Sequence, residues 1–252
     1  MILIGVDCPE TNILYNYLSA HVSIDSVVIE DKISKKKLIR NRLRKIGQLK
    51  VIGQLLFQVF IQKLLLRSSK NRIAEILSMN HLSQATIPDA KILRVSSVND
   101  KDCIDLLNKL NPSIIVVNGT RIISKKVLDS VHAKFVNMHM GITPKYRGVH
   151  GAYWAMANKD PQLCGVTIHL IDEGIDTGSV LKQALISTGP HDNFATYPYL
   201  QLAKGLPLFL ESLQEIEQHN SKTIPPLTNE SSLWYHPTIF EYFYNRFFNK
   251  VS

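Results

Sequence analysis

One run of apolar residues constrains the fold of this chain most. Residues 112–117 read Pro-Ser-Ile-Ile-Val-Val, and a strand that is apolar at consecutive positions is typically buried on both faces of a sheet. Shorter runs at 2–6, 24–29 and 92–95 are separated by helical patterns. Strands that alternate with helices predict an α/β fold, with a mainly parallel central sheet flanked by helices.

The second half of the chain continues this pattern. Further strands are expected at residues 134–139, 165–171 and 179–186. Further helices are expected at residues 100–110, 124–131, 151–158 and 197–219. Pro198 and Pro207 should interrupt the last of these helices. A chain of 252 residues fits one domain with appendages.

The cysteines and the first residues bear on the cellular compartment. Cys8, Cys103 and Cys164 are widely spaced and form no CxxC pattern, so we expect reduced thiols in a cytoplasmic protein. The first residues lack a basic region and reach Asp7 early, so we expect no signal peptide.

The positive charge is concentrated in one segment. Residues 32–72 carry 13 of the 29 Lys and Arg and none of the 21 Asp and Glu. The rest of the chain has 16 basic and 21 acidic residues, a net charge of −5, although the whole chain carries +8. Such a basic segment favours anionic partners, and a solvated helix face is the alternative.

Residues 34–78 are expected to be helical, with Ser34 as an N-cap. Between 51 and 66 the pattern is apolar except for Gln54, Gln58, Gln62 and Lys63. A run of about 16 residues with these polar groups is shorter than the roughly 20 that span a bilayer. A buried helix, or a helix that lies on a membrane surface, fits the segment better.

Aromatic side chains are abundant in the last residues. Residues 234–252 hold eight aromatics, and five of them recur with helical spacing on one face: Phe240, Phe243, Tyr244, Phe247 and Phe248. We expect this face to dock on the core, with a dimer contact or a membrane contact as the alternatives.

One strand end carries the residues best suited to chemistry. Asn137 and His139 are two apart on the strand 134–139 and therefore project to the same face. Ligands of open α/β sheets bind beyond the carboxyl ends of the strands. An acidic, glycine-bearing loop at 171–178 adds the carboxylates of Asp172, Glu173 and Asp176. An amide that stabilises an oxyanion, an imidazole that moves a proton and a carboxylate that orients it can perform acyl transfer.

These motifs resemble those of the folate-dependent formyltransferases. The similar residues are Asn137-x-His139, Pro144-x-Tyr146-x-Gly148, Gly174-Ile175-Asp176-Thr177-Gly178 and the segment Thr120 to Ser124. The resemblance covers roughly residues 75–187 and implies a Rossmann-like formyltransferase fold. It also implies N10-formyltetrahydrofolate as formyl donor and no metal. The chain departs from many members after the histidine, where Met140-Gly-Ile-Thr-Pro144 replaces Pro-Ser-Leu-Leu-Pro.

The resemblance implies a role for each matching residue. Asn137 and protonated His139 would stabilise the oxyanion, and Asp176 would keep His139 charged and oriented. Contacts to the folate, mostly from backbone, would come from Arg121, Ile122, Ile123, Ile171, Asp172 and Glu173. Contacts to the acceptor would come from Lys145, Tyr146, Arg147, Gly148, His150, Tyr153 and Trp154. Core packing is the alternative for Trp154, and we expect structural roles for Thr167 and His169.

The run from Tyr146 to Trp154 indicates the class of formyl acceptor, because it resembles sugar N-formyltransferases of the GDP-perosamine type. The implied acceptor is a nucleotide-linked amino-dideoxysugar, GDP-perosamine-like or dTDP-linked, used for bacterial surface polysaccharide. Lys145 and Arg147 would meet its pyrophosphate. Glycinamide ribonucleotide and methionyl-tRNA remain alternatives. The first needs a glycine-rich phosphate loop that residues 5–10 lack, and the second a C-terminal barrel that we do not expect in this chain.

We expect a catalytic domain at 1–187, with a basic helical insertion at about 33–78, and a helical extension at 188–252. Expected partners are a second copy of the chain in a homodimer and a membrane surface contacted through residues 34–66 or the aromatic tail. That contact would place the protein at the inner membrane surface. A nucleic-acid-binding protein without catalysis is disfavoured, because the basic segment lacks interleaved aromatics.

Overall fold

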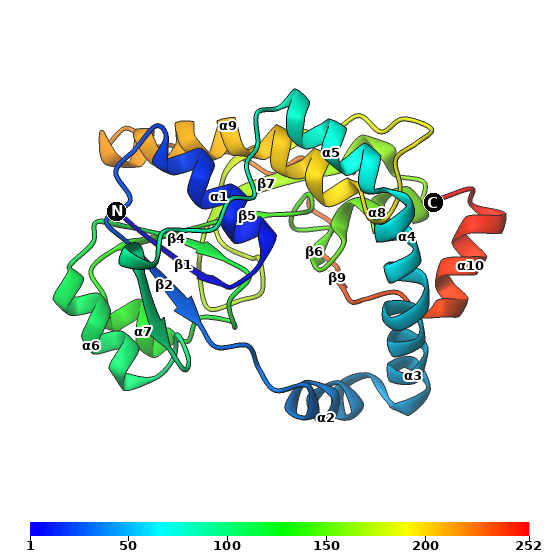
Figure 1. Cartoon of the computed structure of the whole chain (residues 1–252), viewed down its shortest axis with the longest axis horizontal. Helices are drawn as coiled ribbons and strands as arrows, with labels where there is room; N and C mark the ends of the chain where they lie inside the picture. The colour runs from blue at the N-terminus through cyan, green and yellow to red at the C-terminus, as the bar shows by residue number, and fades with distance from the viewer. Residues whose placement is uncertain (252) are drawn as a thin grey trace.

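The computed structural model describes residues 1–251, which contain a central seven-stranded sheet with helices on both faces (Figure 1). The strands of this sheet are β1 Ile2–Val6, β2 Ser26–Glu30, β3 Ile92–Val95, β4 Ile114–Asn118, β5 Lys134–His139, β7 Gly165–Leu170 and β8 Val180–Leu185. A second pair of short strands consists of β6 Arg147–Gly148 and β9 Leu233–Trp234.

The helices occupy the segments between these strands. The α-helices are α1 Pro9–Ser19, α2 Lys35–Ile46, α3 Gln48–Leu56, α4 Gln62–Ser68, α5 Lys70–Met79, α6 Lys101–Leu110, α7 Lys125–Ser130, α8 Gly151–Ala157, α9 Tyr197–Glu217 and α10 Ile239–Phe248. The remaining turns are a π-helix, η1 Phe57–Ile61, and two 3-10 helices, η2 Asp89–Lys91 and η3 Pro161–Leu163.

The sheet is mainly parallel, which confirms the predicted fold class. Its order is β3-β2-β1-β4-β5-β7-β8. The first five strands in this order pair in parallel, while β7 pairs antiparallel with both β5 and β8. The run that predicted a doubly covered strand is β4, and its residues Ile114 to Val117 are buried. This central position places the carboxyl ends of β4 and β5 side by side.

Helices α1, α5 and α9 cover one face of the sheet, and α6 and α7 cover the other. Helix α9 runs continuously through Pro207, so the predicted interruption is wrong. Pro198 lies in the first turn, where an N–H has no helical partner, and Pro207 lies on the exposed side. Gly205 faces Met138 so closely that a Cβ there would lie 2.6 Å from its sulfur. Helix α9 therefore packs directly on β5.

The residues after 187 contribute to the main core. Leu202, Leu206 and Phe209 of α9 belong to the same apolar cluster as Leu3 and Val136 of the sheet. The division of the chain at 187/188 stays a prediction, and α9 forms one of the helical layers that cover the sheet. The predicted basic insertion is helical, because α2 to α5 occupy residues 35–79.

The aromatic face of α10 points to solvent, and the expectation that it docks on the core is wrong. Phe240, Phe247 and Phe248 are each more than 70% exposed. Tyr242 and Asn245, on the opposite side, are buried instead. Thr238 and Glu241 form a reciprocal capping box that starts the helix. The amphipathic pattern therefore located the helix but not the face that packs.

Candidate active site

A cavity of about 710 Å³ lies at the carboxyl ends of β4 and β5. Its walls come from residues 117–123, 137–140, 148–150, 171–172 and 174–176, and from residues 233–235 of the tail. Leu38 and Lys45 of α2 also line it, so the basic insertion forms part of the wall. This is the edge of the sheet at which open α/β folds bind ligands.

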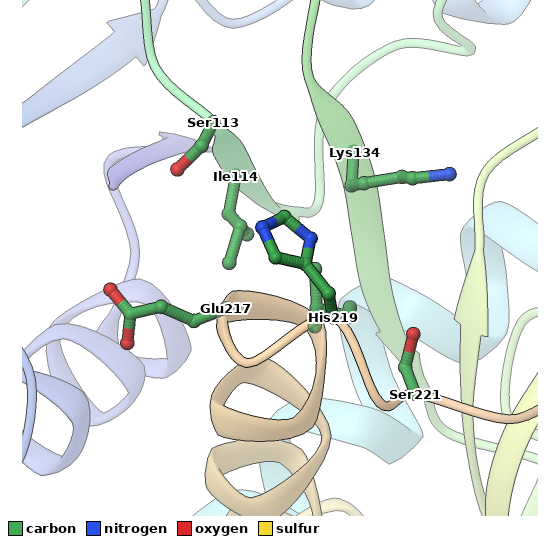
Figure 2. Close-up of a pocket in the computed structure, with 7 residues that line it drawn as sticks. Ser113, Ile114, Lys134, Glu217, His219 and Ser221 are labelled. Carbon is green, nitrogen blue, oxygen red and sulfur yellow. The ribbon is translucent and has the colours of Figure 1, made fainter.

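A second cavity of about 430 Å³ lies at the opposite edge of the sheet, beside the amino ends of β4 and β5. Ser113 before β4, Lys134 of β5, and His219 and Ser221 after α9 line it (Figure 2). No residue of the predicted catalytic trio lines it. The larger cavity is therefore the candidate active site.

His139 is held by hydrogen-bonding groups on both ring nitrogens. Its Nε2 donates to the backbone carbonyl of Tyr146 at 2.7 Å. Its Nδ1 lies 3.4 Å from Oδ2 of Asp176. The ring is therefore oriented by a carbonyl on one side and a carboxylate on the other.

Asp176 is fixed by backbone as well as by the histidine. Oδ2 accepts a hydrogen bond from the Gly148 N–H at 2.8 Å, and the residue has a left-handed φ of 52°. Gly148 precedes the bend that carries His150, so this bond joins the two loops of the cavity. The structure thus brings the three predicted catalytic side chains to one place.

His169 belongs to the same group of polar side chains. Its Nδ1–H donates to the Leu170 carbonyl at 2.8 Å, which leaves Nε2 to accept from Nδ2 of Asn137 at 3.2 Å. Burial and the neighbouring His139 lower the pKa of His169. Sequence reasoning gave His169 only a structural role, although its position on a strand beside the active loop was a usable signal.

The predicted folate-contacting loops line the cavity through most of their residues. Arg121, Ile122, Ile123, Ile171 and Asp172 are among the lining residues, whereas Glu173 is not and pairs with Lys125. The Arg121 guanidinium is bound to Glu30 Oε1 at 2.7 Å, so its side chain fastens the loop to β2. Exposed Ile122 offers apolar surface instead.

Four of the predicted acceptor contacts stay predictions without support from the cavity, because the side chains of these residues are used in packing or ion pairing. Tyr146 and Tyr153 are completely buried, and Trp154 is nearly so. The Trp154 indole donates to the Tyr235 carbonyl at 2.8 Å. Lys145 pairs with Asp160 at 2.8 Å and Glu230 at 2.9 Å. None of these four residues lines the cavity.

The other predicted acceptor residues have different positions. Gly148 and His150 line the cavity. Arg147 donates to the Ile175 carbonyl at 3.0 Å, and its Nε is a buried polar atom without a partner among the described residues. Contacts from these three residues to an acceptor stay predictions.

The tail supplies site residues that sequence reasoning missed. Strand β9 pairs with β6, which brings Trp234 and Tyr235 to the cavity wall. His236 follows, and its Nδ1 lies 2.8 Å from Nε2 of His150. Burial lowers the pKa of both rings, that of His236 to about 4. The Trp-Tyr-His run before the aromatic helix could have pointed to these residues. The strand pairing that brings them to the cavity joins β6 and β9, which are far apart in the sequence.

The fold and the site define a class of protein, namely Rossmann-like enzymes whose amide, imidazole and carboxylate suit acyl transfer. The family profile described as Formyl transferase matches residues 53–199, which is more than half of the chain. The chain therefore belongs to the formyl transferase family, as the motifs indicated.

The individual relatives differ in the formyl acceptor that their descriptions give. The methionyl-tRNA formyltransferase of Finegoldia magna is 41% identical over 91 residues, 36% of this chain and 29% of that protein. An N-formyltransferase from Helicobacter canadensis, solved with folinic acid and dTDP-3-aminofucose, has a TM-score of 0.53 and 18% identity, covering 92% and 70% of the two chains. The phosphoribosylglycinamide formyltransferase of Anaplasma phagocytophilum has a TM-score of 0.56 and 15% identity, covering 91% and 93%.

These similarities differ in what they establish. The chain spans half or less of the length of the curated relatives it matches. The two solved structures share the fold with this chain at low identity. The descriptions of these three proteins give three different acceptors. The comparisons therefore show the family, and the acceptor has to be argued from the site.

Proposed function

We propose that this protein transfers a formyl group from N10-formyltetrahydrofolate to the amine of a nucleotide-linked amino-dideoxysugar. The observation that carries the reaction is the convergence of Asn137, His139 and Asp176 on one cavity at the carboxyl end of β5. Formyl transfer to an amine needs oxyanion stabilisation and proton transfer, and these three side chains provide both.

The folate fits the loops on one side of this cavity. Ile122, Ile171 and Ile175 give apolar wall, and the strand ends that carry them present backbone groups. A flat heteroaromatic ring with polar edges suits such a mixture of apolar side chains and backbone donors and acceptors. When bound there, the folate supplies an electrophilic formyl carbon.

The side chains then have separate tasks. Asn137 donates one Nδ2 hydrogen to the His169 ring, and it can donate the other to a developing oxyanion. The imidazolium form of His139 places a positive charge beside the oxyanion. The Tyr146 carbonyl and Asp176 hold the ring in this position. Asp176 is the group that takes the proton released by the attacking amine, directly or through water. Return of this proton to N10, as the bond between N10 and the formyl carbon breaks, releases tetrahydrofolate and the formamide product.

The acceptor side of the cavity favours an anionic, ring-bearing molecule. Lys45 offers a cation, and it comes from α2, a helix without acidic residues. Trp234 and Tyr235 offer aromatic faces. A nucleoside diphosphate sugar carries the matching groups, namely phosphates for Lys45 and rings for the aromatic residues. The neighbour from Helicobacter canadensis, solved with dTDP-3-aminofucose, supports the same class.

The test is a panel of acceptors incubated with N10-formyltetrahydrofolate and read by product mass. The panel contains nucleotide-linked 3- and 4-aminosugars, glycinamide ribonucleotide and methionyl-tRNA. We expect one added formyl group on a sugar nucleotide and none with the Asn137→Ala/His139→Ala variant.

Formylation of methionyl-tRNA alone would support the second candidate, which the Finegoldia magna relative favours. In that case the acceptor is wrong and the formyl transfer stands. A panel without any formylated product, together with no tetrahydrofolate released, would overturn the reaction itself.

A further inference from the structure

Two neighbouring helical segments lie at one end of the molecule (Figure 1). Both bury a polar side chain and expose apolar ones. The first is the continuous helical run Gln48–Ser68, formed by α3, η1 and α4. The second is α10. A Cβ at Gly53 would lie 2.8 Å from Thr238 Cβ, so the first segment packs tightly against the start of the second.

In the first segment a polar side chain faces the protein. Gln54 is only 3% exposed and donates to the His236 carbonyl at 2.7 Å. The outward side carries Leu49, Ile52, Phe60 and Leu64, with exposures of 87%, 54%, 61% and 63%. A helix on the surface of a soluble domain normally has the opposite arrangement.

Helix α10 repeats this reversal. Asn245 is buried and donates to the Tyr153 hydroxyl at 3.0 Å. Phe240, Phe247 and Phe248 face solvent with exposures of 76%, 71% and 72%. We call the exposed apolar residues of the two segments the apolar end surface; its members are Leu49, Ile52, Leu56, Val59, Phe60, Leu64, Leu66, Phe240, Phe243, Tyr244, Phe247 and Phe248. So many exposed apolar side chains on two helices that pack against each other are typical of an interaction site.

The basic side chains around this surface indicate which kind of partner it binds. Lys50, Lys63 and Arg67 are exposed on the same helical run, within the segment 32–72 that has 13 basic and no acidic residues. Two copies that met through this surface would bring these like charges together. Anionic phospholipid headgroups attract them instead. Aromatic rings beside basic side chains are the composition of helices that lie in a membrane interface.

We propose that the apolar end surface rests on an anionic membrane as a peripheral contact. The run Gln48–Ser68 is long and apolar enough to cross a bilayer by length and composition. However, the Phe57 ring packs 4.9 Å from Phe194 and 5.2 Å from Tyr242, and a membrane crossing would remove these contacts together with that of Gln54. Lying on the surface preserves them and covers the outward side.

The test is flotation of the full chain with vesicles of phosphatidylcholine, either pure or containing phosphatidylglycerol. We expect binding to the anionic vesicles that falls at least tenfold in the Phe247→Ser/Phe248→Ser variant and in the Lys63→Glu/Arg67→Glu variant. High salt should release the protein, because the Debye length is only about 3 Å at 1 M. Met79→Ser is the matched control, since Met79 is 70% exposed at the end of α5.

Each variant is also checked for unchanged thermal unfolding and for unchanged formyl transfer in solution, which the membrane contact does not require. Absence of binding to anionic vesicles would overturn the proposal, as would equal binding by all variants. Conversion from dimer to monomer by Phe247→Ser/Phe248→Ser, without vesicle binding by the parent protein, would assign the surface to a second copy. Binding that resists both salt and alkaline carbonate would indicate a spanning segment instead.

Discussion

Asn137 on β5 and His169 on β7 face each other directly in the antiparallel register, and the Asn137 amide donates to the His169 ring at 3.2 Å. The other ring nitrogen is occupied by the Leu170 carbonyl, so the neutral ring can only accept at Nε2. Burial, together with the neighbouring His139, lowers the pKa of His169 and favours this neutral form. His169 is thus a positioning residue that orients the amide of Asn137.

Replacing His169 tests this role. We expect His169→Leu to lower kcat about tenfold with little change in KM, because the amide loses its orientation while the cavity keeps its shape. His169→Gln, which keeps an acceptor, should recover part of the rate. Steady-state kinetics on both variants distinguish a positioning role from a structural one. If the substitutions only reduced the amount of folded protein, the apparent kcat would fall equally in both variants.

The catalytic side chains themselves should matter more. We expect Asn137→Ala and His139→Ala each to reduce kcat by about 10²–10³, the usual effect of losing one oxyanion-stabilising group. Unfolding temperature should change little in Asn137→Ala. His132→Ala is the control, because His132 is exposed and precedes the amino end of β5, whereas the cavity lies at the carboxyl end. Near-normal turnover in both active-site variants would remove these residues from the mechanism.

Gly141 controls the geometry of the loop after His139. A Cβ at this position would lie 2.8 Å from Nε2 of His139 and would also press on the Tyr146 carbonyl that holds this nitrogen. We therefore expect Gly141→Ala to lower kcat tenfold or more and to reduce the unfolding temperature. Gly189→Ala is the comparison, since its Cβ meets only Asp192 at an ordinary 3.5 Å. Calorimetry and kinetics on the two variants should separate them clearly.

The His150–His236 pair predicts a loss of stability in mild acid. Burial lowers the pKa of His236 to about 4 from an ordinary 6.5, and that of His150 well below 6.5. The unfolded chain therefore binds protons first, so stability is present above pH 6.5 and falls as the pH drops toward 4. For His236 alone the loss is at most about 3 kcal/mol.

Urea unfolding between pH 7.5 and 4 measures this dependence. His236→Gln removes one titrating ring while keeping a hydrogen-bonding side chain, so its stability should fall less steeply over this range. Titrating groups far from residue 236 contribute equally to both proteins and cancel in the comparison. Identical slopes for the two proteins would show that His236 does not titrate on unfolding.

Local patterns in the sequence determined much of the fold and the catalytic centre. The apolar run at β4 predicted a doubly covered strand, because burial on both faces leaves no place for alternating polar residues. Asn137 and His139 were identifiable because a two-residue spacing on one strand puts both side chains on one face. Asp176 was identified only because residues 174–178 resemble a family motif, since its loop also holds Asp172 and Glu173.

Only the tertiary structure decided the uses of residues whose partners are distant in the sequence. Lys145 finds Asp160 and Glu230, and the tail brings Trp234 to the cavity by pairing with β6. The same applies to α10, where periodicity defined an aromatic face but the surrounding contacts turned that face outward. A helical pattern records which side chains share a side, whereas the side that is buried depends on what the rest of the chain places against it.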